Sequence, residues 1–315
     1  MGYRLGSDRK QRPLHSSWHR GSTTNYTPSK KNMAEKQAIE RYILHGWVPK
    51  APPIKPGSRI VAIGSCFAMH IAEHLRKSKL LRVNDGDPEI NLFIFGDGFV
   101  NTFTLRNQFE WALGLRELDV GVLSVRLKNA PRGAESVGTM QITPKIRAAS
   151  KAAIESADAF ILTLGLSEVW RDRATGEVFF GAIPKEKFDP ARHYFEVSTV
   201  EENLANLRAL YLLLRRTRPR APIIFTLSPV PLTATFRPIS CLTANSASKA
   251  ILRVAIDDLM RERQAADPLL FYWPSYEIVL ERFGLAGFRE DRRHIEPKVL
   301  AVIMGLFERY FVAKT

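Results

Sequence analysis

The stretch RIVAIGSCFAMHIAEHLRK, residues 59–77, decides the fold of this chain. Its first six residues, 59–64, form a short apolar run of the kind found in buried strands. From about residue 67 to residue 77 the apolar side chains recur at helical spacing instead. Gly64 and Ser65 form the junction between the two patterns. A strand that passes through a tight turn directly into a helix predicts an α/β fold.

Strand and helix patterns keep alternating toward the carboxyl end. The sequence predicts further strands at 159–165, 223–227 and 269–273, and helices at 200–215, about 245–264 and about 297–311. Thr199 and Glu202 match a capping box in front of the helix at 200–215. Since parallel strands need helical crossovers, we expect a three-layer α/β/α sandwich with a mainly parallel sheet. The stretch 176–197 is rich in aromatic and turn residues, and it predicts a hairpin or loop excursion near the edge of the sheet.

The positive charge is concentrated at the amino end. The chain of 315 residues has a formal net charge of +14, and residues 1–57 hold 11 Lys/Arg against 3 Asp/Glu. We expect a basic flexible leader over 1–57, with a short helix and a Pro-rich linker, and a catalytic domain over 58–315. Such a leader could meet nucleic acid, an anionic membrane or an acidic polysaccharide. A solvated tail is the simpler interpretation, so no specific nucleic-acid partner is predicted.

Cysteine content and hydropathy predict a cytoplasmic location. Cys66 and Cys241 are the two cysteines of the chain, too few for a disulfide framework. No apolar run is long enough to span a bilayer, and the first 20 residues lack the apolar stretch of a secretory signal. The Arg/Ser-rich, acid-poor start nevertheless has a faint resemblance to an organellar transit peptide.

Ser65 is the candidate nucleophile because it follows a predicted strand and precedes a predicted helix. Unpaired N–H groups and the positive end of the helix dipole stabilise a developing oxyanion at such a position. Gly64 permits the sharp turn that exposes the hydroxyl group. Two alternatives remain, namely that Ser65 only caps the helix, or that Cys66 is the nucleophile.

Several motifs resemble those of one protein family. Gly-Ser-Cys-Phe-Ala at 64–68 is the signature of the GSCFA family, which looks like a branch of the SGNH/GDSL-type hydrolases with Gly-Ser-Cys in place of Gly-Asp-Ser. Later blocks that resemble this family are Thr163-Leu164-Gly165 with Trp170, Leu227-Ser228-Pro229-Val230, Ser248-Lys249, and Trp273-Pro274-Ser275-Tyr276-Glu277. The resemblance covers about residues 58–300 and implies a flavodoxin-like SGNH hydrolase fold.

His294 is the candidate general base. Asp291 precedes it by three residues, and Pro297 follows where a helix is predicted to begin. On one loop, an Asp carboxylate can accept the imidazole Nδ1–H while Nε2 faces the serine. A charged surface cluster is the alternative. The order Ser65, Asp291, His294 along the chain matches that of SGNH hydrolases, so the resemblance favours a Ser-His-Asp triad.

The same resemblance implies an oxyanion hole built by a Gly and an Asn from two intermediate blocks. At the expected Gly-x-Asn-Asp the chain reads Gly165-Leu166-Ser167-Glu168, so the Asn side chain is replaced by Ser167. For the other block the candidates are Gly98 and Asn101. Lys249 is a further candidate that could bind a substrate carboxylate or phosphate, although an ordinary solvated lysine is the simpler interpretation.

Two competing signals need a structural test. His70, Glu73 and His74 fit the H-x-x-E-H zinc pattern, but they also form the polar side of the predicted helix, and no metal site is predicted. Trp170, Trp273 and Tyr276 can line a sugar-binding cleft, with core packing as the alternative.

The sequence thus predicts a serine esterase or O-acyltransferase that acts on acyl esters, such as an acetylated carbohydrate or another acylated small molecule. No cofactor is expected, except acetyl-CoA or another acyl donor if the enzyme transfers the acyl group. The alternative is a non-catalytic binding or scaffold protein that engages an anionic partner through its basic leader. The oligomeric state is not predicted.

Overall fold

The computed structural model describes residues 21–64, 73–75, 77, 81–83, 101–117, 125–126, 137–138, 144–180, 183 and 185–314. Ser65, Cys66, His70 and Gly98 lie outside these residues, as do residues 1–20 of the predicted leader. The helix predicted from about residue 67 is described only at 73–75 and 77, which are helical.

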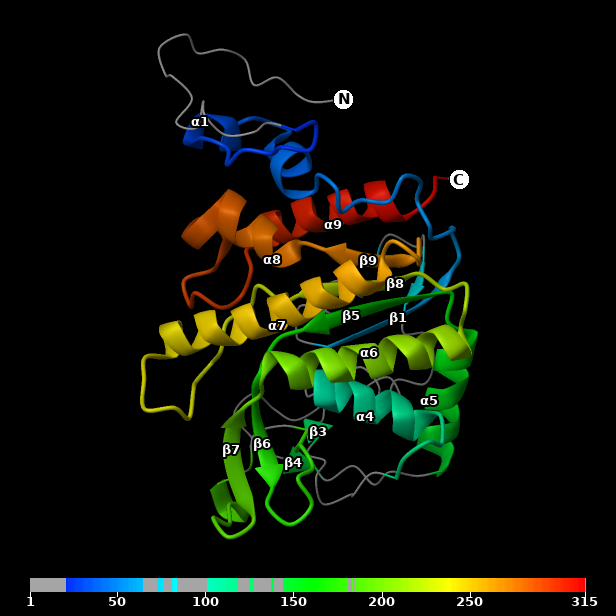
Figure 1. The fold of residues 1–315 in the computed structure, drawn as a ribbon, viewed down its shortest axis with the longest axis vertical. Coiled ribbons are helices and arrows are strands. Elements are labelled where there is room, and N and C mark those ends of the chain that lie inside the picture. Colours follow the sequence, from blue (N-terminus) through cyan, green and yellow to red (C-terminus); the bar gives the residue numbers. More distant parts are fainter. Residues whose placement is uncertain are drawn as a thin grey trace.

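A parallel sheet of five strands forms the centre of the molecule (Figure 1). Its order is β2 (Arg82–Val83), β1 (Arg59–Gly64), β5 (Ala159–Leu164), β8 (Ile223–Leu227) and β9 (Leu270–Trp273), and every neighbouring pair is parallel. Counted along the chain, this is the order 2-1-3-4-5 of flavodoxin-like sheets. The expected mainly parallel α/β fold is therefore confirmed. The order reverses at β1, so the ligand crevice of this sheet is expected outside the carboxyl ends of β1 and β5.

Successive residues of each central strand point to opposite faces of the sheet. On β1, Val61 and Ile63 belong to one hydrophobic cluster while Ile60 and Ala62 belong to the other. The same alternation holds along β5, β8 and β9. Strands buried on both faces read as continuous apolar runs, which is why they could be recognised in the sequence.

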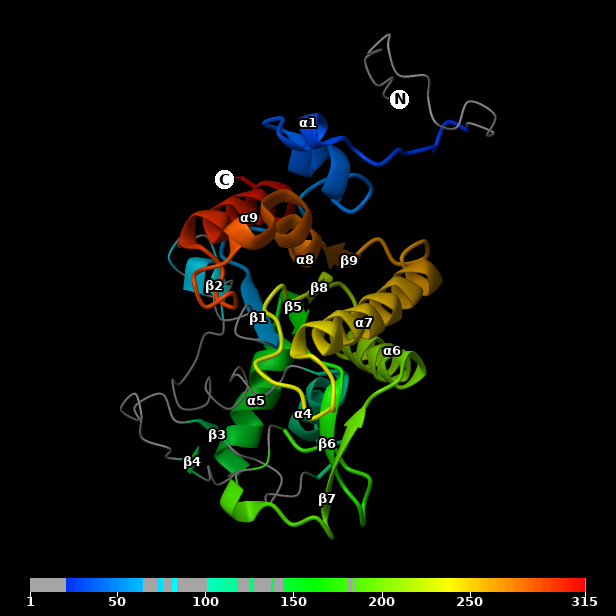
Figure 2. The same cartoon turned by 90° about the vertical axis from the view of Figure 1, so that its left-hand side faces the viewer.

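Helices cover both faces, as Figures 1 and 2 show. One cluster packs under α4 (Thr102–Ala112), α5 (Pro144–Ser156), α6 (Val200–Thr217) and α7 (Cys241–Arg263). The other packs under α9 (Pro297–Phe311) together with the π-helical turns η1 (Ile39–Ile43) and η4 (Ile278–Phe283). The capping box of Thr199 and Glu202 is present at the start of α6. None of the helices in the described part of the chain combines the length and the apolar run needed to span a bilayer.

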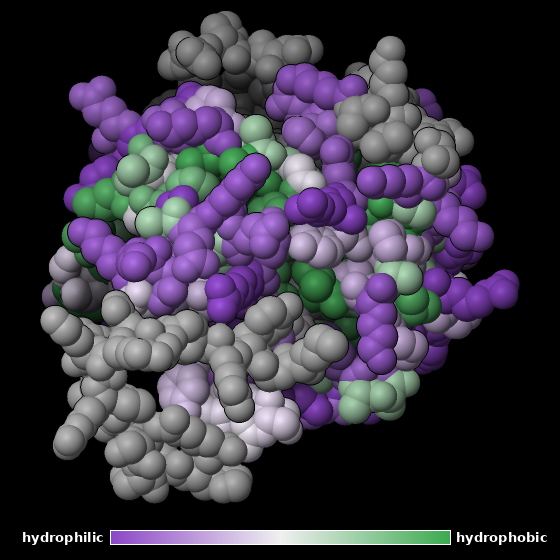
Figure 3. Space-filling view, turned by 90° about the horizontal axis from the view of Figure 1, so that it is seen from above, coloured by the Kyte–Doolittle hydropathy of each residue, from purple (hydrophilic) through white to green (hydrophobic). Residues whose placement is uncertain are grey.

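Part of the predicted leader packs onto the domain. Ile39, Leu44 and Ile54 are buried in the cluster beneath α9, and Ile54 forms a backbone bridge with Val312. The short helix α1 (Lys30–Met33) precedes this segment and has no buried residue. Seen from above, polar side chains cover much of this side of the molecule, with apolar side chains visible between them (Figure 3). The apolar residues near 38–54 therefore contribute to the core, while the domain boundary at residue 57 stays a prediction.

Several elements differ from the sequence-based expectation. Helices α4 and α5 were not predicted, because α4 buries polar as well as apolar side chains and α5 buries only Ile146, Ser150 and Ile154. Helix α7 begins at Cys241, about four residues earlier than predicted, with Ser240 as its N-cap.

The excursion after β5 is a hairpin that begins earlier than predicted. Strand β6 (Glu168–Asp172) pairs antiparallel with β7 (His193–Val197), and η3 (Lys185–Lys187) lies between them. The remaining short elements are β3 (Val125–Arg126), β4 (Val137–Gly138), α8 (Ser275–Glu277) and η5 (Gly284–Gly287).

Candidate active site

Gly64 brings the end of β1 unusually close to β5. Its φ is +135°, and a Cβ at this position would lie 2.0 Å from the backbone oxygen of Thr163. Only glycine fits, because both the backbone conformation and the contact exclude a side chain. Gly64 therefore ends β1 beside β5, at the edge where the crevice is expected. Ser65, the next residue in the chain, lies outside the described residues.

Asp291 and His294 form a contact pair on the loop before α9. Asp291 Oδ2 contacts His294 Nδ1, and Asp291 Oδ1 accepts hydrogen bonds from the backbone N–H groups of Arg293 and His294, both at 3.0 Å. The two side chains are 46% and 52% exposed, respectively. With Nδ1 directed at the carboxylate, Nε2 is the ring nitrogen left to exchange a proton with another group. This is the Asp-His arrangement that the spacing predicted.

Backbone hydrogen bonds hold this loop in shape. The N–H of Arg289 donates to the carbonyl of His294 at 2.8 Å, and the N–H of Glu296 donates to the carbonyl of Gly287 at 2.9 Å. Pro297 then starts α9. The loop lies at the end of the sheet toward which the arrow of β5 points (Figure 1), which is the end that carries Gly64.

The pKa of the Asp291 carboxyl is held well below its usual range, first by the hydrogen bond with His294 and then by the two backbone N–H donors. We expect His294→Gln to raise this pKa toward the ordinary value of about 3.9, though not fully, because both backbone donors remain. A pH titration of the Asp291 carboxyl by ¹³C NMR measures the change. His74→Gln is the control and is expected to leave the pKa of Asp291 unchanged.

The sign of the linked stability change follows from this shift. A carboxyl whose pKa is lower in the folded state stabilises the fold above its unfolded pKa, and that contribution is lost as the pH falls through the folded pKa. The stability advantage of the native chain over His294→Gln is therefore expected to shrink below about pH 4. An advantage that grew on acidification would contradict the pair as described.

Ser167 is fully buried and is held by its neighbours. Its N–H donates to Ser248 Oγ at 2.9 Å, its hydroxyl donates to the same oxygen at 3.2 Å, and its carbonyl accepts from Ser198 Oγ at 2.7 Å. The single hydroxyl proton is therefore used inside the fold. This geometry does not support Ser167 as the oxyanion donor that replaces Asn.

Lys249 is not a solvated lysine, since only 1% of its surface is exposed. Its Nζ donates to the carbonyls of Gly165 and Val230, both at 2.8 Å. These carbonyls follow β5 and β8, so the ammonium group ties together the exits of two neighbouring strands. Ser248 and Lys249 thus hold the Gly165–Ser167 loop from one turn of α7.

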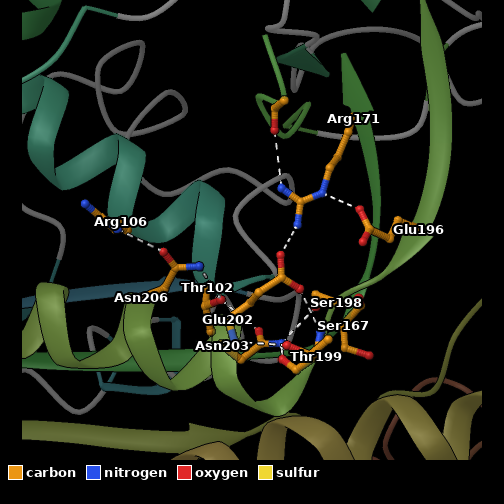
Figure 4. A network of polar contacts seen from close by, with 11 residues as sticks. Thr102, Arg106, Ser167, Arg171, Glu196, Ser198, Thr199, Glu202, Asn203 and Asn206 are labelled. Carbon is orange, nitrogen blue, oxygen red and sulfur yellow. Dashed lines mark hydrogen bonds and ion pairs between the residues drawn. The ribbon is translucent and has the colours of Figure 1, made fainter. Parts of the chain in front are cut away.

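A chain of polar side chains links the Gly165–Ser167 loop to the start of α4 (Figure 4). Ser198 Oγ accepts from Asn203 Nδ2 at 2.8 Å, and Asn203 Oδ1 accepts from Thr102 Oγ1 at 2.8 Å. Thr102 directly follows Asn101, the N-cap of α4. Asn203 and Ser198 were not singled out from the sequence. Their only signal is a polar residue at a buried helical or strand-end position, which becomes visible once the burial is known.

Comparisons with known proteins agree with the motifs. The GSCFA family matches residues 59–307. The chain belongs to the GSCFA family. No curated protein matches this GSCFA chain.

Among solved structures, the GSCFA chain is similar to a carbohydrate esterase of family 3 from Talaromyces cellulolyticus, with 10% identity, a TM-score of 0.36, and coverage of 81% of this chain and 95% of that chain. It is also similar to an acetyl xylan esterase from the rumen bacterium Butyrivibrio proteoclasticus, with 12% identity, a TM-score of 0.33, and coverage of 82% of this chain and 64% of that chain.

Two residues of the zinc pattern in this GSCFA chain, Glu73 and His74, contact neighbouring charged side chains. His74 Nε2 lies 3.4 Å from Glu308 of α9, and Glu73 pairs with Lys77 at 2.7 Å. His70, the first residue of the zinc pattern, lies outside the described residues, so the pattern stays a prediction.

The three aromatic residues have different environments. Trp273 is 1% exposed and packs edge-on against Phe307 in the core. Tyr276 is half-buried against the core on the α7 face. Trp170 packs with Phe195 and with Phe236, which is 57% exposed, at the β6–β7 hairpin. The core alternative therefore holds for Trp273, while Trp170 belongs to an aromatic group that reaches the surface.

Proposed function

We propose that this GSCFA chain is an SGNH-type serine ester hydrolase or O-acyltransferase that acts on acyl esters, such as acetyl esters of carbohydrates. Ser65 is the nucleophile, His294 the general base and acid, and Asp291 the group that orients the imidazole. The observation that carries the proposal is the contact of Asp291 with His294 Nδ1, at the same end of the sheet as Gly64.

The reaction proceeds in two halves. Ser65 Oγ attacks the acyl carbon while His294 Nε2 takes the hydroxyl proton, and the electron pair of the carbonyl bond moves to its oxygen. When that pair returns, the ester C–O bond breaks, and the imidazolium gives its proton to the departing alcohol. Water or an acceptor hydroxyl then attacks the acyl-enzyme by the same steps and releases Ser65. Asp291 remains ionised and stabilises the imidazolium, consistent with its lowered pKa.

Acyl transfer and hydrolysis differ only in the molecule that takes the acyl group from Ser65. A transferase needs an activated acyl donor, such as acetyl-CoA, and no other cofactor enters the proposed steps. The half-exposed His294 would be reachable from solvent, as both acceptors require.

A fluorophosphonate probe tests the nucleophile, because it phosphonylates activated nucleophiles, above all the serine of a serine hydrolase. We expect the full chain to be labelled at Ser65 and the Ser65→Ala variant to remain unlabelled, with hydrolysis of 4-nitrophenyl acetate lost in parallel. Cys66→Ala is the matched control, since it tests the neighbouring thiol, and it is expected to retain labelling. An unlabelled native chain, or labelling that depends on Cys66 alone, would overturn the serine mechanism and favour a binding protein or a thiol enzyme.

A further inference from the structure

Arg289 and His294 share one face of the loop before α9. Phe288 and Ile295 form an antiparallel bridge across this loop, and the N–H of Arg289 donates to the carbonyl of His294 at 2.8 Å. Ile295 is buried in the cluster beneath α9, and Phe288 packs against the same cluster. Because successive residues of paired strands point to opposite sides, Arg289 and His294 both point away from the core, and both are exposed. Residues paired in this way have Cβ atoms about 4.5–5.5 Å apart, so one substrate can contact both side chains.

The positive charge of Arg289 is not neutralised by the rest of the described chain. Most arginines in the described part of the chain pair with a carboxylate, as Arg253 does with Glu277 at 2.8 Å. Within the described residues, Arg289 forms no ion pair, and neither do Arg292 and Arg293 on the same loop. The Nε of Arg293 is buried and has no hydrogen-bond partner there. The loop that carries the candidate base therefore presents three arginines without a counter-ion.

The acidic residues of the loop do not supply this counter-ion. Asp291 is engaged by the side chain of His294 and by two backbone N–H groups. Glu290 and Glu296 form no ion pair with any described residue. A cation next to His294 disfavours the imidazolium that the proposed reaction forms. An anion bound beside the imidazole removes this penalty, because it offsets the charge of the arginine.

We propose that Arg289 is a specificity-determining residue that binds an anionic group of the substrate, a carboxylate or a phosphate, beside His294. This inference rests on the proposed function and narrows its substrates to anionic acyl esters. A guanidinium group donates two parallel N–H hydrogen bonds to either anion. The loop lies at the end of the sheet that carries Gly64, so an anion bound here belongs to the reacting molecule (Figure 1). It comes either from a carboxylate on the alcohol part of the ester or from a phosphate on an activated acyl donor.

Three small esters test the proposal, because they differ mainly in charge. The anionic esters are 4-acetoxybenzoate and 4-acetoxyphenyl phosphate, and methyl 4-acetoxybenzoate is the neutral one. We expect Arg289→Gln to lower the ratio of kcat/KM for an anionic ester to kcat/KM for the neutral ester by at least about tenfold, mainly through KM. A larger loss with the phosphate identifies a phosphate-bearing substrate, and a larger loss with the benzoate identifies a carboxylate-bearing one.

Arg289→Lys separates the charge from the shape of the guanidinium group. It keeps the positive charge but cannot donate two parallel hydrogen bonds, so we expect a ratio between those of the native chain and Arg289→Gln. Added sodium chloride is expected to lower the ratio for the native chain and to have less effect on Arg289→Gln, because salt screens the lost attraction. The salt dependence of the native chain is a readout that needs no variant.

Arg261→Gln is the matched control. It removes the same charge from an exposed arginine in the last turn of α7, outside the loop that carries His294. We expect its ratio of kcat/KM values to stay near that of the native chain. Circular dichroism and the urea midpoint check that each variant is folded, which is expected for Arg289→Gln because only the backbone of Arg289 takes part in the loop hydrogen bonds.

The outcomes distinguish this inference from the proposed function. A native chain that hydrolyses none of the three esters in a Ser65-dependent manner overturns the proposed function, and this inference with it. Ser65-dependent hydrolysis with the same ratio in the native chain and in folded Arg289→Gln would overturn this inference alone and leave Arg289 as a solvated loop residue.

Discussion

Replacing His294 by alanine is expected to lower the turnover of an acyl ester by about 100- to 10,000-fold. The imidazole both receives the serine proton and returns it to the leaving alcohol, so neither half of the reaction retains its acid or base. Removing one member of a working triad also disables the other members. Because His294 is half-exposed on a surface loop, the substitution is expected to leave the fold intact. Steady-state kinetics with 4-nitrophenyl acetate, together with circular dichroism, measure both effects.

His74→Ala is the matched control for this prediction. His74 lies against Glu308 of α9 rather than on the loop with Asp291, so its loss is expected to leave turnover near that of the native chain. Chelators are expected to have no effect. Equal losses for His70→Ala, His74→Ala and His294→Ala, with recovery on added zinc, would instead identify a metal site.

Replacing Gly64 by alanine is expected to lower the free energy of unfolding by about 3 kcal/mol or more. The new Cβ would need the space of the Thr163 backbone oxygen, 2.0 Å away, so β1 or β5 must shift. The φ of +135° adds backbone strain that no side chain can relieve. Urea unfolding of the purified full chain measures the loss, and the disturbed exit of β1 is expected to remove Ser65 labelling as well.

Gly57→Ala separates the strain from the clash. Gly57 also has a positive φ, +78°, but nothing lies within 4 Å of its Cβ position. Its replacement is expected to lower the free energy of unfolding by only about 1 kcal/mol, because the left-handed backbone conformation is the only unfavourable feature for alanine there. Equal losses at Gly57 and Gly64 would contradict the close approach of β1 and β5.

The sequence by itself determined the parallel sheet and the Asp-His pair. Strands that are buried on both faces are apolar along most of their length. The strands at 59–64 and 223–227 could therefore be predicted from the sequence without any tertiary information. Asp291 and His294 are three residues apart, so a single loop suffices to bring their side chains together. Local signals of this kind, like the capping box at Thr199, depend on few neighbours.

Only the tertiary structure decided which polar residues are buried and what they contact. The sequence favoured an ordinary solvated lysine at position 249. In the structure its ammonium group is buried between the carbonyls of Gly165 and Val230, which are 84 and 19 residues away in the chain. Likewise, no pattern in the sequence indicates that the Ser167 hydroxyl donates a hydrogen bond to Ser248. A buried polar group needs partners, and its partners come from distant segments, so sequence spacing alone cannot identify them. Helix α4 was missed for the same reason, because it buries polar side chains whose partners lie on α6.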